Sequence, residues 1–322
     1  MNESVMLTRI FGQINSSTSI LIGLFALALS IGHFFFLPVP DFALTTAWGT
    51  VVLLPLVGYS LLGLGIAGFV FGMQWLLEYK YKLLKKHAYF SFFISVVLLL
   101  FIKYGGLNLL VDLLFLLLIL GSWLSVYQGE KLLGRSLNTG LLIGFGSIFD
   151  QRISLLLLFS FVVYVIFGRL NLRTFLILIV GFVTIWLNAL ALEFIIFDSS
   201  IVYASFLAIF DFTSPALIAD LDMPDLLLLG AFLVISLPEF ITTFNRASVF
   251  KRQSHSILLL LAVLAIVLYV LSGPEVFYLA IYIPATIALF VNYFQYIKRG
   301  WIQELILWLA IATLALADFG IF

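Results

Sequence analysis

Eight ionisable residues stand where a chain embedded in lipid could carry out chemistry. Carboxylates accept protons from hydroxyl groups, and lysine and arginine bind phosphate through charge-assisted hydrogen bonds. Ionisable side chains are costly in lipid, and those found there usually mark a site or a pathway. We expect these eight to lie at one depth, near the outer membrane surface, and to converge there: His33, Asp41, Lys103, Asp112, Asp150, Arg152, Glu193 and Asp198.

The residue types suggest a role for each member of this outer set. Asp41, in the first predicted outer loop, is the candidate catalytic base, and His33 nearby is its candidate helper. Lys103 and Arg152 are the basic residues expected on the outer side, and they are the candidate ligands of a lipid phosphate. The remaining carboxylates are assigned to the lipid-phosphate and substrate-binding site: Asp112, Asp150, Glu193 and Asp198.

A structural alternative stays open for the same residues. Asp112 with Lys103, and Asp150 with Arg152, would then form ion pairs that only stabilise the fold. The pattern predicts no metal and no cofactor. No two histidines have the spacing of metal ligands. HExxH, Walker and GxSxG motifs are missing from the sequence, and no GxGxxG stands directly before a predicted helix.

The elements that must position these residues are membrane helices. Hydrophobic residues make up 64% of the chain and charged residues only 10%, whereas a soluble domain carries about 25% charge. The chain also has no cysteine. We predict an all-α, polytopic membrane protein forming a single integral membrane domain, 1–322, with about eleven transmembrane helices in the apolar runs 17–36, 49–77, 88–102, 107–126, 137–149, 153–167, 174–197, 225–244, 256–271, 276–297 and 302–322.

The distribution of basic residues predicts the orientation. If the N-terminus is cytoplasmic and each run crosses once, every lysine and arginine except Lys103 and Arg152 falls on the cytoplasmic side. An added or missing span would destroy this alternation, so we predict an N-in, C-out arrangement in the inner (cytoplasmic) membrane. The net charge of zero indicates no nucleic-acid partner, which leaves membrane lipids as expected partners.

A short helix pair at 137–167 surrounds the corner Asp150-Gln151-Arg152. The first run, 137–149, has 13 residues, or about 20 Å of helix, against a bilayer core of about 30 Å. We therefore expect the corner to lie at or slightly below the membrane surface. A re-entrant hairpin is the alternative for this pair. A second outer feature is the segment 198–224, which we expect to lie in the membrane interface as short helices.

Small and aromatic residues predict packing details. Gly140 and Gly144 form a GxxxG pattern, which lets two helix backbones approach closely. Trp123 stands at a predicted span end and is typical of an interfacial belt. Pro55 and Pro284 lie inside predicted spans, where they would kink the helices.

Two stretches carry a family resemblance: LNTGLLIGFGSIFDQRISLLLLFSFVVYVIFGR in the centre and FVNYFQYIKRGWIQELILWL near the C-terminus. They resemble an uncharacterised family of polytopic inner-membrane proteins common in Bacteroidota. The central pattern also resembles the membrane module of the GT-C glycosyltransferases, which use polyprenyl-phosphate sugars. That resemblance implies a catalytic aspartate in the first outer loop, the position of Asp41, and short central helices near a lipid-phosphate site. The first outer loop, 37–48, is shorter than in that class and lacks its acidic pair.

Three functions are compatible with this pattern. The first is cell-envelope biogenesis, with a GT-C-like protein that handles a polyprenyl-linked sugar at the outer leaflet. The second is a non-catalytic membrane subunit or scaffold, with protein partners in an envelope or secretion complex. The third is a transporter or flippase, suggested by Glu239 directly after Pro238 inside a predicted span.

Overall fold

A computed structural model describes most of the central and C-terminal chain. The described residues are 43–46, 49–52, 55–84, 89–127, 129, 131–196, 230–231, 234–235, 237, 247–272, 276–294, 297 and 300–318. Four earlier predictions fall outside these residues, and the structure leaves them as predictions: His33, Asp41, Asp198 with the interfacial segment 198–224, and Glu239.

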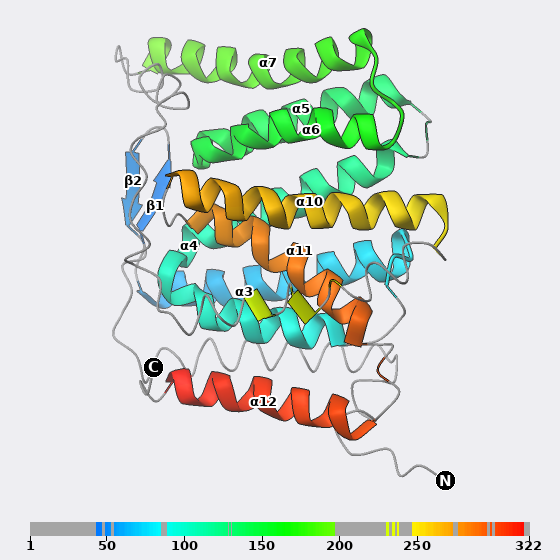
Figure 1. Cartoon of the computed structure of the whole chain (residues 1–322). Coiled ribbons are helices and arrows are strands. Elements are labelled where there is room, and N and C mark those ends of the chain that lie inside the picture. The colour runs from blue at the N-terminus through cyan, green and yellow to red at the C-terminus, as the bar shows by residue number, and fades with distance from the viewer. Residues whose placement is uncertain are drawn as a thin grey trace.

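The described part of the chain is built from long apolar helices that run roughly parallel or antiparallel to one another (Figure 1). Six of them are long and apolar enough to cross a membrane. The protein is therefore a multi-pass membrane protein, as predicted, while the total of eleven spans stays a prediction. The helices are α3 (Pro55–Gln74) with its π-helical extension η1 (Trp75–Lys80), α4 (Tyr89–Val126), α5 (Leu132–Phe149), α6 (Leu155–Ile166), α7 (Leu172–Ile196), α10 (Val249–Ser272), α11 (Val276–Phe294) and α12 (Gly300–Asp318).

The chain before α3 forms a small hairpin that the sequence analysis did not predict. Strands β1 (Ala43–Thr46) and β2 (Gly49–Val52) pair antiparallel, with Ala43 opposite Val52. Threonine and valine favour extended backbone, which accounts for strands here. The predicted span over 49–77 is therefore wrong at its start. Pro55 is the first residue of α3, where proline fits well, so it does not kink a helix.

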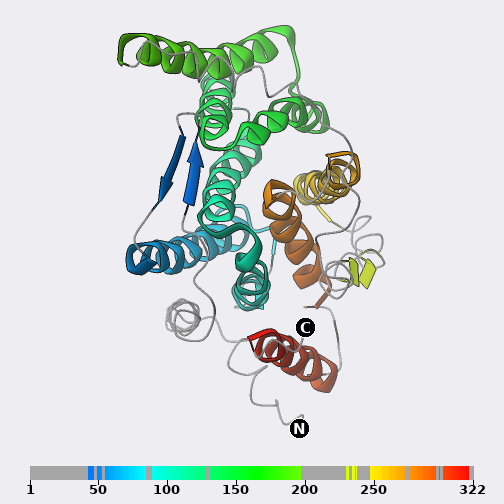
Figure 2. The same cartoon turned by 90° about the vertical axis from the view of Figure 1, so that its left-hand side faces the viewer.

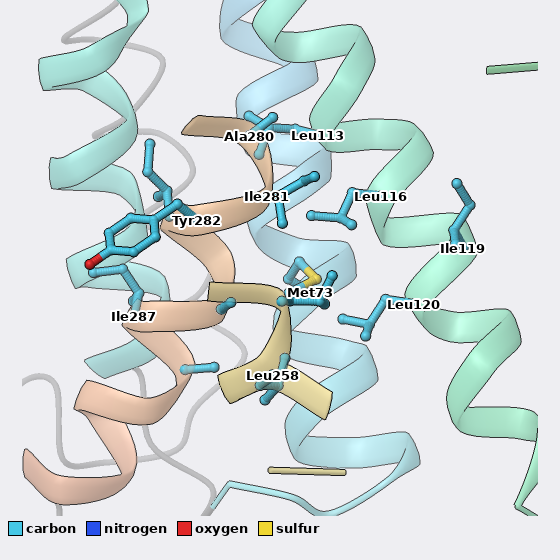
Figure 3. Close-up of a cluster of buried hydrophobic side chains, with 14 of the residues drawn as sticks. Met73, Leu113, Leu116, Ile119, Leu120, Leu258, Ala280, Ile281, Tyr282 and Ile287 are labelled. Atoms are coloured by element: carbon cyan, nitrogen blue, oxygen red, sulfur yellow. The ribbon is translucent and has the colours of Figure 1, made fainter. Parts of the chain in front are cut away.

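Helix α4 combines two of the predicted runs. It has 38 residues, which would measure about 57 Å if straight, almost twice the bilayer core. Figure 1 shows its ribbon turning back on itself, and Figure 3 shows its two halves on different sides of α11. The Gly105-Gly106 pair lies in the middle of α4, where glycines permit such a bend. Lys103 thus belongs to helical backbone and not to the outer loop that we predicted.

The first helix of the central pair is longer than expected. Helix α5 begins at Leu132 and has 18 residues, so the prediction of an undersized helix over 137–149 is wrong. The second partner is short, as predicted: the 3-10 turn η2 (Gln151–Ser154) leads into α6, which has 12 residues. Helix α5 spans about 27 Å, enough to cross most of a bilayer core, so the corner after it lies at the end of a full span.

Helices α5 and α7 pack through glycines, which confirms the packing role of the GxxxG pattern. A methyl group added at Gly140 would overlap with the backbone carbonyl oxygen of Leu178, and one added at Gly144 would lie 2.9 Å from the carbonyl oxygen of Phe182. From the other side, a methyl group on Gly181 would lie 2.6 Å from the carbonyl oxygen of Leu137. The two backbones are thus in direct contact, and there is no room for a side chain at these three glycine positions.

The core lies between α3, α4, α10 and α11. Helix α11 is buried along most of its length, and Pro284 lies inside it as predicted. Figure 3 shows Ile281 of α11 close to Leu116 of α4, and Met73 of α3 close to Leu120 of α4. In a membrane protein this apolar contact is stabilised by packing and not by removal of water, because lipid also surrounds the outer faces.

Two tryptophans tie the central helices together by hydrogen bonds. The indole N–H of Trp123 donates to Ser160 Oγ at 2.9 Å, and that of Trp186 donates to Ser147 Oγ at 2.8 Å. Trp123 is fully buried, so the prediction that it belongs to an interfacial belt is wrong. Its polar N–H is satisfied inside the bundle by a residue far away in the sequence.

Basic residues gather at one end of the bundle. Helix η1 ends, α5 begins and α6 is joined to α7 at the right-hand end in Figure 1, while α5 ends and η2 begins at the left-hand end. The described residues at or next to these right-hand helix ends include the basic residues Lys80, Lys82, Lys131 and Arg169. This separation agrees with the predicted alternation of charge, and it sets Arg152 apart from these cations.

Candidate functional site

The corner between α5 and η2 is fixed by one carboxylate. Asp150 ends α5 by adopting an extended backbone conformation, φ −132° and ψ 115°. Its side chain then caps η2 by accepting a hydrogen bond from the backbone N–H of Arg152 at 2.9 Å. A second, looser interaction joins the Arg152 guanidinium Nη1 to Asp150 Oδ2 at 3.8 Å. The predicted Asp150–Arg152 ion pair is therefore confirmed.

Asp112 of α4 completes this corner. Its side chain is 2% exposed, and neither carboxylate oxygen has a hydrogen-bond partner among the described residues. The charges that act on it most strongly are those of Asp150 and Arg152. The structure thus brings together three residues of the predicted outer set, and we call Asp112, Asp150 and Arg152 the acidic corner. The alternative pairing of Asp112 with Lys103 stays open, because the Lys103 side chain lies outside the described part.

The acidic corner is electrostatically unbalanced. Burial raises the pKa of the Asp150 carboxyl, and the Arg152 guanidinium beside it offsets part of that effect. A carboxyl with a raised pKa exchanges protons more readily near neutral pH, which is the property required of a general acid or base. Two carboxylates share one guanidinium here. The cluster is therefore suited to bind a proton, or to respond when a ligand brings additional charge.

Glu193 lies at the same end of the bundle. Helices α5 and α7 run in the same direction, because Gly140 lies against Gly181 and Gly144 against Ile185. Continuing this register places Glu193 at the level of the Asp150 corner, and its side chain is 2% exposed. The common depth of Glu193 and a direct contact with the acidic corner both stay predictions.

A second polar cluster was missed by the sequence analysis. Gln74 Nε2 donates to Glu78 Oε2 at 3.2 Å, and Ser91 Oγ donates to Gln74 Oε1 at 2.6 Å, joining α3 and η1 to α4. All three side chains are buried. The i, i+4 spacing of Gln74 and Glu78 was the available signal, because it places both on one helical face.

The described residues define the class of this protein: a multi-pass α-helical membrane protein with a buried carboxylate–arginine cluster where α5 ends. Among the residues that the structure covers, no group of three His, Asp or Glu side chains is placed to hold a metal ion. The chain belongs to the family described as Family of unknown function (DUF6427), whose family model matches residues 6–320. No curated protein matches the chain. No solved structure matches it either.

Proposed function

We propose that this protein acts in cell-envelope biogenesis and handles a polyprenyl-linked sugar at the outer leaflet of the inner membrane. The observation that supports the proposal is the acidic corner itself, in which Asp112, Asp150 and Arg152 from two separate segments meet at the end of a membrane span. The resemblance of the central sequence to the GT-C membrane module is consistent with such a substrate.

Arg152 supplies the phosphate-binding group in this proposal. Its side chain is 42% exposed, and a guanidinium carries five N–H donors, so it can contact Asp150 and a phosphate together. The arriving phosphate adds negative charge beside two carboxylates, which favours uptake of a proton by the Asp112–Asp150 pair. Phosphate binding and proton uptake are thus coupled at the acidic corner.

Sugar transfer from such a donor requires a base. The hydroxyl group of the acceptor gives its proton to a carboxylate, its oxygen bonds to the anomeric carbon, and the bond from that carbon to the phosphate oxygen breaks. Polyprenyl phosphate leaves with the electron pair of the broken bond. Asp41, helped by His33, is the proposed base. Lys103, Glu193 and Asp198 are the further proposed substrate-site residues.

Arg152→Ala tests phosphate binding. Loss of a charge-assisted hydrogen bond costs about 1.5–3 kcal/mol, so we expect binding of polyprenyl phosphate to weaken about tenfold or more. Native mass spectrometry of the purified protein with added polyprenyl phosphate measures this, and profiles of lipid-linked sugars in cells give the functional readout. Arg173→Ala, an exposed arginine in the first turn of α7, is the control. Equal binding by both variants and unchanged sugar profiles would contradict the proposal.

A second candidate function is a proton-coupled transporter or flippase. The observation that favours it is the burial of Asp112, because carboxyl groups inside membrane proteins often relay protons. Transport in proteoliposomes under an imposed pH gradient separates the two functions. A transporter would move a lipid-linked substrate without breaking its sugar–phosphate bond, whereas a transferase would release polyprenyl phosphate.

A further inference from the structure

Helix α7 lies at the edge of the bundle and packs against its neighbours through one face only (Figures 1 and 2). Gly181, Phe182 and Trp186 form the buried face, which packs against α5. Of the candidate spans, the α7 window is the least buried, at 28%, against 89% for the window of α11. Among the described residues, little covers the other face of α7.

That exposed face carries two polar residues within the apolar span. Thr184 and Asn188 are both exposed, and they lie inside the apolar window Leu172–Ile195. Thr184 Oγ1 donates to the carbonyl oxygen of Val180 at 2.7 Å, so its hydroxyl is satisfied within the helix. Asn188 Nδ2 donates to the carbonyl oxygen of Thr184, also at 2.7 Å.

The Asn188 amide is only partly satisfied by that bond. A side-chain amide has two N–H donors and a carbonyl oxygen with two lone pairs, and one donor is used here. The hydrocarbon region of a bilayer offers no water for hydrogen bonds, so polar atoms that face lipid there are costly. In membrane proteins asparagine at such a position promotes association with another helix that supplies a partner.

We propose that the outer face of α7 binds the same face of α7 in a second copy of this chain, with Asn188 exchanging amide hydrogen bonds with Asn188 of that copy. Two copies inserted in one orientation are related by an axis normal to the membrane, which places Asn188 of both at the same depth. An amide is donor and acceptor at once, so two identical amides satisfy each other.

The residues around Asn188 suit a helix–helix contact. Thr184, Asn188 and Ala191 follow i, i+4, i+7 spacing and are smaller than the flanking Val180 and Leu187, so two backbones can approach along this line. No charged residue lies between Arg173 and Glu193, so two identical faces do not repel each other there. Thr184, Asn188 and Ala191 are all exposed and are not among the residues that pack on α5, so this inference is independent of the proposed function.

Cysteine crosslinking of the full-length chain in membranes tests the interface. Because the native sequence has no cysteine, Ala191→Cys is the only thiol in its variant. We expect oxidation to give a covalent dimer through Ala191→Cys. Leu158→Cys, at an exposed position on α6, is the control and should remain monomeric. Failure of Ala191→Cys to crosslink, or its crosslinking to a different protein in native membranes, would overturn the proposal.

Asn188→Leu separates the amide contact from apolar packing. Interhelical hydrogen bonds of this kind contribute about 1–2 kcal/mol, which corresponds to a dissociation constant raised about 5- to 30-fold. Single-molecule photobleaching in liposomes over a range of protein-to-lipid ratios measures that constant. Asn138→Leu, at an exposed position on α5, is the matched control and should leave it unchanged. Equal dimerisation of Asn188→Leu and the unmodified chain would show that Asn188 has no role.

Discussion

Gly140→Ala is expected to destabilise the protein by about 3 kcal/mol, the upper range for overpacking, because the added methyl group would overlap with the carbonyl oxygen of Leu178. Backbone cannot move aside as the end of a flexible side chain can, so α5 and α7 must separate. The separation would also disturb the bond from Trp186 to Ser147. Thermal unfolding in detergent, followed by tryptophan fluorescence, measures the loss.

Gly134→Ala is the matched control on the same helix. A methyl group at Gly134 meets no atom within 4 Å, and alanine is favoured over glycine inside a helix by about 1 kcal/mol. We therefore expect this variant to be as stable as the unmodified chain or more stable. Comparable destabilisation by both substitutions would show that the α5–α7 glycine contact does not hold the pair together.

Asp112→Asn is expected to abolish function while leaving stability unchanged or raised. The carboxylate is buried beside a second carboxyl group, that of Asp150, which is a costly arrangement that a fold would not need. An amide has nearly the same size but exchanges no proton near neutral pH. We expect the lipid-linked sugar profile to change as in cells that lack the protein, and thermal unfolding to shift upward or not at all.

A purely structural role for Asp112 predicts the opposite pattern. Removing one partner of a buried ion pair costs about 3–5 kcal/mol, so the variant would then unfold easily and lose function only through loss of folded protein. Glu304→Gln in α12 is the control, because Glu304 is another buried carboxyl, on a different helix from any residue of the acidic corner. An unstable Asp112→Asn variant, or a stable one with a normal sugar profile, would contradict the functional role.

Much of the fold follows from simple patterns. Apolar runs predicted most of the helices, and the basic residues predicted which helix ends share one side of the membrane. The Gly140-xxx-Gly144 pattern predicted a close contact, although its partner, Gly181, could not be identified from the sequence. Periodicity indicates which residues share a face, but it does not reveal which helix that face meets.

The start of α5 shows why a boundary was missed. The predicted run began at 137, directly after the polar Ser136, and Thr139 is a second polar residue inside it. In the structure their hydroxyl groups donate to the carbonyl oxygens of Leu132 and Arg135, at 2.9 Å in both bonds, which satisfies them within the helix. The Arg135 guanidinium donates to the carbonyl oxygen of Ser125 in α4. This tertiary contact has no signal in the local sequence.

For the candidate site, the sequence predicted the Asp150–Arg152 pair but not the approach of Asp112 to it. Hydropathy placed Asp112, Asp150 and Arg152 at one level, and the structure brings them together because α4 packs against α5 at the corner. The same reasoning placed Lys103 in a loop, where the structure has helix. A pair of glycines in a sequence suggests a turn, but it also permits a helix to bend without ending.

The orientation of the acidic corner is the claim on which the account depends, and cysteine labelling tests it directly. The chain has no native cysteine, so single variants need no background correction. With a maleimide that cannot cross membranes, we predict that Gln151→Cys is labelled in spheroplasts, and that Lys131→Cys is labelled only after permeabilisation. Labelling of Lys131→Cys in sealed spheroplasts, with Gln151→Cys protected until permeabilisation, would place the corner in the cytoplasm and contradict the account.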